Sequence, residues 1–206
     1  MYTIDQFDNP FEAIKEFENQ ISKYTGAPYA IATDCCTHAL EISFRLNIPK
    51  NTVKIPCRTY LSVLMTLHKL NIEYELDDID WNGGYQILGT NVWDMARCLE
   101  ENMYCSDSIQ CLSFGRTKPL EIGRGGMILT DNKDFAQAAS KMRYDGRDVF
   151  AFSPWVDQKE FNVGYHYYMR PEEAVEGLNK LNTKTFTIQD KKFYNYPDCR
   201  KIIIRP

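Results

Sequence analysis

The sequence predicts an α/β fold with an abbreviated, mostly parallel sheet flanked by helices. In its first half, short apolar runs alternate with amphipathic segments of helical length, a pattern typical of βαβ units. The chain of 206 residues suits one compact domain, and a hydrophobic content of 44% is ample for a core. The sequence also contains no internal repeat or low-complexity linker that would suggest another architecture.

The expected elements follow from local patterns of apolar residues. An amphipathic helix is expected over about residues 10–24, with Gly26 ending it. A second helix should start near Thr37, and further helices are expected over 60–70, 135–144 and 171–181. The expected strands cover residues 29–33, 53–56, 72–76, 85–88, 91–93, 110–114 and 127–130. In the first half of the chain the expected strands alternate with helices, which favours parallel pairing.

The composition changes after Arg147, where the sequence becomes aromatic and irregular. We therefore expect an α/β domain over residues 1–150 and a short C-terminal segment over 151–206. Within that segment, Pro171 suits the first turn of a helix. The apolar run at residues 202–204 predicts a terminal strand that lies at an edge or docks on the domain.

Charge and apolar content argue against several classes of protein. The net charge is −4 and no basic stripe is present, so nucleic acid is not an expected partner. The longest apolar runs are far too short to cross a bilayer, and the first ten residues lack a signal core. The seven cysteines form an odd set without metal-type spacing, and we expect free thiols, a cytoplasmic protein and no metal site.

Three candidate sites lie where expected strands end, which is where ligands bind in open α/β sheets. The first is TDCCTHAL, residues 33–40, where a strand is followed at once by a helix start. Backbone N–H groups and the positive end of the helix dipole favour a phosphate there, and the Thr37 hydroxyl can add a hydrogen bond. The alternative is that Thr37 is an ordinary helix cap.

The second and third candidates are Asp94 and Lys118. Asp94, in VWDMAR, could hold a proton on the ring nitrogen of a pyridine cofactor, although a helix cap is the alternative. Lys118 lies between an expected strand and a glycine-rich turn in CLSFGRTKPLEIGRGG. A partly desolvated lysine there can lose its proton and form a Schiff base, whereas the alternative is a solvated surface charge. Ser113 and Arg116, just upstream, have the polarity to bind phosphate.

These motifs resemble, in the same order, those of the DegT/DnrJ/EryC1/StrS sugar aminotransferases, which share the type I aminotransferase fold. The family's SGTxAL loop resembles residues 35–40, and its Pro-x-x-Thr-aromatic motif resembles residues 56–60. Its Asp-x-Ala motif corresponds to residues 94–96, and its lysine with a glycine-rich turn corresponds to residues 113–126. A late Gly-Tyr-Asn-Tyr-x-Met element resembles residues 164–169.

The resemblance implies a pyridoxal 5′-phosphate (PLP) enzyme that transfers an amino group to a keto sugar, with a nucleotide-linked sugar as the expected substrate. Glutamate or glutamine would be the donor. Residues 1–150 would form the PLP-binding domain, like the family's large domain, with the small C-terminal domain largely missing. Lys118 would carry the cofactor and act as the base, and Asp94 would hold the pyridine nitrogen. The other cofactor-binding residues that the resemblance implies are Cys36, Thr37, Tyr60, Arg97, Ser113 and His166.

The resemblance also implies a homodimer, with His166 reaching the phosphate of the neighbouring subunit. His166 replaces the family's usual Asn, Arg97 replaces a Gln near the 3-oxygen, and Arg124 replaces an acidic residue. The chain has roughly half the family's usual length, and residues 80–94 leave no room for an inserted helix and strand. Two alternatives therefore stay open: a PLP-dependent dehydratase, and a catalytically silent subunit or sugar-nucleotide-binding partner.

Overall fold

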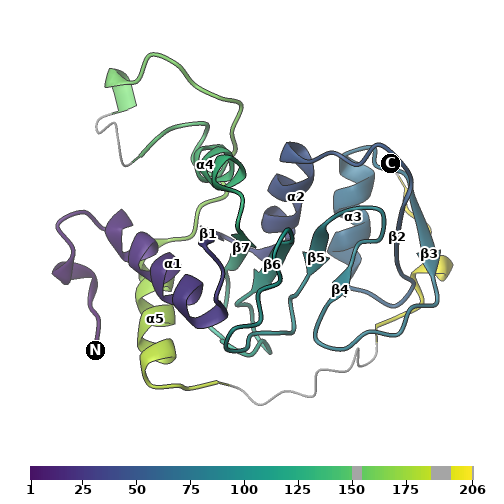
Figure 1. The fold of residues 1–206 in the computed structure, drawn as a ribbon, viewed down its shortest axis with the longest axis horizontal. Helices are drawn as coiled ribbons and strands as arrows, with labels where there is room; N and C mark the ends of the chain where they lie inside the picture. Colours follow the sequence, from purple (N-terminus) through teal and green to yellow (C-terminus); the bar gives the residue numbers. More distant parts are fainter. Residues whose placement is uncertain (150–154, 187–195, 206) are drawn as a thin grey trace.

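The computed structural model describes residues 1–149, 155–186 and 196–205, and its centre is a five-stranded sheet with helices on both faces (Figure 1). The strand order is β1-β7-β6-β5-β4, and β2 and β3 form a separate pair. The strands are β1 (Tyr29–Thr33), β2 (Val53–Pro56), β3 (Tyr74–Asp77), β4 (Tyr85–Gln86), β5 (Val92–Asp94), β6 (Ile109–Ser113) and β7 (Gly126–Thr130). The helices are α1 (Phe11–Thr25), α2 (Cys36–Leu46), α3 (Leu61–Lys69), α4 (Lys133–Met142) and α5 (Pro171–Asn182), with 3-10 turns at Ile4–Gln6, Trp155–Asp157 and Cys199–Lys201.

The α/β class and the abbreviated sheet are confirmed, but the strand directions are mixed rather than mostly parallel. Only β5–β6 and β2–β3 pair in parallel, whereas β1–β7, β6–β7 and β4–β5 are antiparallel. β4 runs against β5 because residues 87–91 alone join them, which allows a hairpin but no crossover helix. Two backbone hydrogen bonds between Lys54 and Leu88, of 3.0 and 2.9 Å, connect β2 to this hairpin.

Two apolar cores cover the two faces of the central sheet, because side chains alternate along each strand. Ile31 and Ile128 belong to the core that contains α2, α3 and part of α4. Their neighbours Ala32, Met127 and Leu129 belong to the core formed with α1 and α5. The sheet is thus buried on both sides, which explains why β7 is apolar or small over most of its length and buried throughout.

The helix α5 packs directly against α1, far away in the sequence (Figure 1). A Cβ atom at Gly177 would lie 2.6 Å from the Phe17 ring, so only glycine permits this approach. Met169, Ala174 and Leu178 are buried in the same core as α1. The division of the chain into two parts at residue 150 stays a prediction.

The prediction of a strand at residues 202–204 is wrong. Asp198 instead begins a 3-10 turn over Cys199–Lys201, with its carboxylate accepting a hydrogen bond from the Arg200 N–H at 3.0 Å. The buried residue of this segment is Cys199, whereas Ile203 is 80% exposed. The apolar run follows this turn and lies outside any assigned strand, although Ile202 itself is extended, with φ −91° and ψ 133°.

Two further expectations concern the cysteines and membrane-spanning segments. All seven cysteines are free thiols. No helix in the described ranges is long and apolar enough to cross a membrane.

A buried ion pair joins α1, β1 and the end of α4. The Arg143 guanidinium is 1% exposed and donates hydrogen bonds to the Glu18 carboxylate and to the Ala32 carbonyl, the latter at 2.5 Å. The Glu18 carboxylate also accepts the Ala32 N–H at 2.7 Å. Both ions thus have several polar partners, which offset the cost of removing them from water.

We predict that Glu18→Ala lowers the free energy of unfolding by about 3–5 kcal/mol, because it leaves the buried Arg143 charge without its carboxylate. Urea denaturation followed by circular dichroism measures this loss. Glu12→Ala, at an exposed position on the same helix, is the control and should change stability far less. Equal losses in the two variants would contradict the assigned role of the ion pair.

Candidate active site

A cavity of about 350 Å³ lies where β5 and β6 end and where α2 and α3 begin. It brings together seven of the eight residues predicted from the sequence. These are Cys36, Thr37, Tyr60, Asp94, Arg97, Ser113 and Lys118. The two predicted catalytic residues, Asp94 and Lys118, therefore line the same space although they lie in different segments of the chain.

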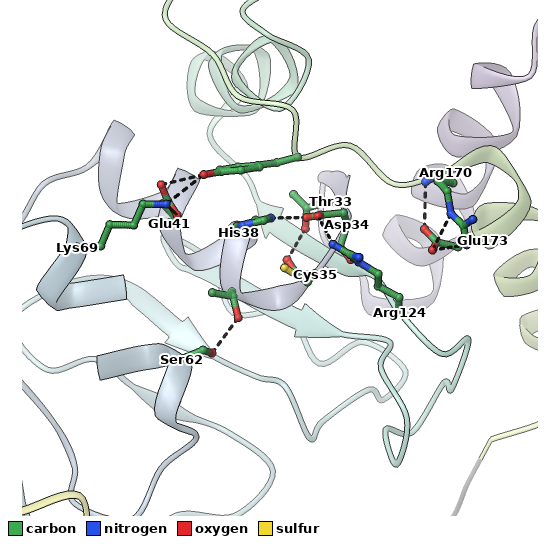
Figure 2. A network of polar contacts seen from close by, with 12 residues as sticks. Thr33, Asp34, Cys35, His38, Glu41, Ser62, Lys69, Arg124, Arg170 and Glu173 are labelled. Atoms are coloured by element: carbon green, nitrogen blue, oxygen red, sulfur yellow. Dashed lines mark hydrogen bonds and ion pairs between the residues drawn. The ribbon is translucent and has the colours of Figure 1, made fainter. Parts of the chain in front are cut away.

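The start of α2 forms the polar end of this cavity. Cys35 precedes the helix in extended conformation, and its side chain does not cap the first turn. The first-turn N–H groups have no partner within the helix, so they can bind an anion. The Thr37 hydroxyl donates a hydrogen bond to the Ser62 hydroxyl at 2.8 Å (Figure 2). Sequence reasoning missed Ser62, which lies in the first turn of α3 and also lines the cavity.

Asp94 is the last residue of β5 and is 6% exposed. Its carboxylate accepts hydrogen bonds from the Tyr85 hydroxyl at 3.2 Å and from the Ala96 N–H at 3.0 Å. The described residues just after Asp94 form a turn, so Asp94 does not cap a helix. Burial raises the pKa of Asp94, while the Ala96 N–H, the Lys118 charge and the Tyr85 hydroxyl act in the opposite direction.

Tyr85 is a supporting residue that sequence reasoning did not identify. Its hydroxyl lies 2.5 Å from the Thr59 hydroxyl and also contacts the Asp94 carboxylate. Burial is the main reason why the pKa of Tyr85 lies well above its usual value, with the Asp94 charge adding to it. Tyr85 therefore stays neutral and donates a hydrogen bond that orients Asp94.

Lys118 has a lowered pKa, and burial is the largest cause. The charges of Asp94 and Cys36 oppose this shift, whereas the Arg97 charge adds to it. A lowered pKa increases the fraction of neutral amine near neutral pH, and the neutral form is the nucleophile and the base. Lys118 is therefore not a solvated surface lysine.

Cys36 is unsuited to act as a nucleophile. Burial raises the pKa of its thiol well above the usual value, and the Asp94 charge raises it further. Only the thiolate is strongly nucleophilic, so the neutral thiol is a lining residue. Its sulfur contacts the Cys111 carbonyl oxygen at 3.6 Å, which helps to place the helix start over β6.

An aromatic side completes the cavity. Tyr60 precedes α3 and is 60% exposed, so its ring is accessible to a ligand rather than part of the core. Trp81 and Tyr196 line the same side. Sequence reasoning missed both, since they lie outside the recognised motifs and only tertiary contacts bring them to the cavity.

His166 does not line the cavity. Its ring nitrogen Nδ1 lies 3.1 Å from the Asp145 carboxylate, and its side chain is 68% exposed. The predicted contribution of His166 to a neighbouring subunit therefore stays a prediction.

A polar network outside the cavity ties the start of α2 to the segment that carries His166 (Figure 2). Arg124 donates to the Asp34 carboxylate at 2.7 Å, and this carboxylate also binds the His38 ring at 2.6 Å. His38 stacks on Tyr167 with ring centroids 3.6 Å apart. Burial alone lowers the pKa of His38, but hydrogen bonds with Asp34 and Cys35 raise it to about 9. His38 is thus protonated near neutral pH and acts as a structural link.

Solved structures with this fold include aminotransferases. AtS13 from Actinomadura melliaura shares 16% sequence identity with the chain at a TM-score of 0.69, covering 83% of this chain and 60% of AtS13. The aminotransferase TlmJ from Streptoalloteichus hindustanus shares 19% at a TM-score of 0.67, covering 82% and 58%. DesI, solved in the presence of its TDP-sugar product, shares 19% at a TM-score of 0.63, covering 84% and 53%.

The chain therefore spans about 60% or less of the length of these three relatives. Comparison with curated proteins gives no significant match. The model of the DegT/DnrJ/EryC1/StrS aminotransferase family matches residues 3–86 and 100–195, which is most of the sequence. The chain accordingly belongs to the DegT/DnrJ/EryC1/StrS aminotransferase family, whose members use pyridoxal 5′-phosphate.

Proposed function

We propose that the chain is a PLP-dependent aminotransferase that acts on a nucleotide-linked keto sugar, with glutamate or glutamine as the amino donor. The observation that carries this proposal is the meeting of Asp94, Lys118 and the start of α2 at one cavity. The TDP-sugar product reported for DesI supports the choice of a nucleotide-linked sugar.

The lining residues fit the chemistry of PLP. The start of α2, with Cys36 and Thr37, offers N–H groups and a hydroxyl to the phosphate, and Ser113 lies on the same lining. Asp94 offers a buried carboxylate to the ring nitrogen, and Lys118 offers an amine with a lowered pKa. We further propose that Tyr60 covers one ring face and that Arg97 approaches the 3-oxygen.

When bound, PLP supplies an electron sink that stabilises negative charge on the carbon beside the substrate nitrogen. Lys118 would hold the cofactor through its Nζ atom and, once released, would act as the base that takes a proton from the substrate carbon beside the nitrogen and returns it to the cofactor's C4′ carbon. Asp94 would keep a proton on the ring nitrogen. Its negative charge would attract that proton strongly because the carboxylate is buried away from water. Tyr85 keeps the carboxylate in place through its hydroxyl.

We also propose that the enzyme is a homodimer in which His166 of one subunit reaches the phosphate site of the other. The exposure of His166 supports this arrangement, because its side chain is accessible while it lies outside its own cavity. Tyr167, the next residue, is linked to the start of α2 through His38, so a partner bound at this segment would adjoin the phosphate end of the cavity.

We predict that PLP attaches to the wild-type protein at Lys118 and becomes permanently linked there after borohydride treatment. Absorbance before and after reduction, followed by peptide mass spectrometry, measures the linkage. Lys118→Ala should lose it, because Lys118 is the one lysine among the described residues that line the cavity. Lys133→Ala, at the exposed start of α4, is the matched control and should keep it. A wild-type protein without an adduct, or an equal adduct in Lys118→Ala, would rule out the proposed function.

A second prediction concerns the protonation of Lys118 in protein without added PLP. Reductive methylation at increasing pH, read by peptide mass spectrometry, should give Lys118 a midpoint below the ordinary value of 10.5. Asp94→Asn should lower this midpoint further, because the Asp94 charge stabilises the protonated amine. Lys54 is an internal control, since its pKa is raised by its pairing with Glu75. A Lys118 midpoint at or above that of Lys54 would contradict the burial argument.

A third prediction identifies the reaction. The PLP-loaded protein, given glutamate or glutamine and a nucleotide-linked keto sugar, should form an amino sugar and the corresponding 2-oxo acid. Mass spectrometry of the sugar distinguishes this product from the loss of water that a dehydratase would cause. Lys118→Ala should form neither product. Linkage of PLP without any sugar product from these substrates would instead favour a catalytically silent subunit.

A further inference from the structure

The described end of the chain, residues 196–205, folds back onto the segment that presents Tyr60 to the cavity. The Cys199 N–H donates a hydrogen bond to the Cys57 carbonyl at 2.8 Å, and its sulfur lies 3.7 Å from the Thr59 carbonyl oxygen. Cys199 is 3% exposed. In Figure 1 the chain end accordingly lies beside β2 and β3. This anchor places Tyr196 next to the cavity.

Tyr196 lies three residues before this anchor and lines the cavity. Its ring packs edge-on against Tyr60, with centroids 6.3 Å apart, and nearly parallel to Trp81 at 6.1 Å. Trp81 is itself held by a hydrogen bond from its indole N–H to the Arg58 carbonyl at 2.9 Å. Three aromatic rings from three distant parts of the sequence therefore form one wall.

The hydroxyl of Tyr196 also has a polar partner inside the cavity. Burial raises the pKa of Tyr196, while a hydrogen bond with Arg97 and the charge of Arg97 lower it. Arg97 in turn lowers the pKa of Lys118. Tyr196 thus contacts Arg97, whose charge lowers the pKa of Lys118, the amine on which the proposed chemistry depends.

We propose that Tyr196 is a positioning residue that completes the Tyr60 side of the cavity, holds Arg97 and limits the access of solutes to Lys118. The identity of PLP as the ligand rests on the proposed function, whereas the covering of Lys118 does not. Tyr196 makes the described residues 196–205 part of the working site rather than a structural appendage.

Two measurements test this role in the full chain. The first is the maximum rate of reductive methylation of Lys118, measured at pH values above its pKa. The amine is then neutral in every variant, so differences in pKa do not affect this limiting rate. Tyr196→Ala should raise this rate several-fold, because it opens the wall. The second is the dissociation constant for PLP, which Tyr196→Ala should raise about tenfold, the scale of a lost aromatic contact with its hydrogen bond.

Tyr196→Phe keeps the ring and should leave the limiting rate within about twofold of wild type, since the effect on access comes from ring packing. Ile203→Ala, in the same segment but 80% exposed, is the matched control and should change neither quantity. An unchanged labelling rate in Tyr196→Ala, or tighter PLP binding by it, would overturn the proposal. If wild type binds no PLP, the proposed function fails, and the labelling rate still decides the role of Tyr196.

Discussion

The close approach of β7 to the start of α2 is the constraint on which the site depends. A Cβ atom at Gly126 would lie 2.4 Å from the carbonyl carbon of Cys35 and 2.5 Å from the Cys36 nitrogen. Only glycine allows the sheet and the helix start to approach so closely. This contact sets the first turn of α2 above the ends of β6 and β5, so that its N–H groups, Asp94 and Lys118 share one cavity.

Burial then decides the protonation of the groups in that cavity. It raises the pKa values of Asp94, Tyr85 and Cys36 and lowers that of Lys118, because the charged form of each group loses hydration. The charges of Asp94 and Lys118 partly compensate each other. The hydrogen bonds to Asp94 also favour its charged form, so a carboxylate and a neutral amine, which the proposed function requires, are compatible in one site.

Segments outside the recognised motifs help to enclose the cavity. Residues 87–91 join β4 and β5 as a short hairpin, so β4 runs against β5. Trp81, from the loop before β4, and Tyr196, from the C-terminal segment, supply part of the cavity wall. The cavity is thus lined partly by residues that the sequence motifs did not point to.

The sequence by itself determined most helices and strands, since apolar periodicity and strand–helix boundaries are local properties. It also identified Asp94 and Lys118, because each follows or ends a strand, and ligands bind where strands end. Only the tertiary structure decided the strand directions, the anchoring of the C-terminal residues by the turn at Cys199–Lys201 rather than by a strand at 202–204, and the contributions of Tyr85 and Tyr196. These features depend on hydrogen bonds and ring contacts between distant segments, which no local sequence pattern encodes. The backbone hydrogen bond from Cys199 to Cys57 is an example.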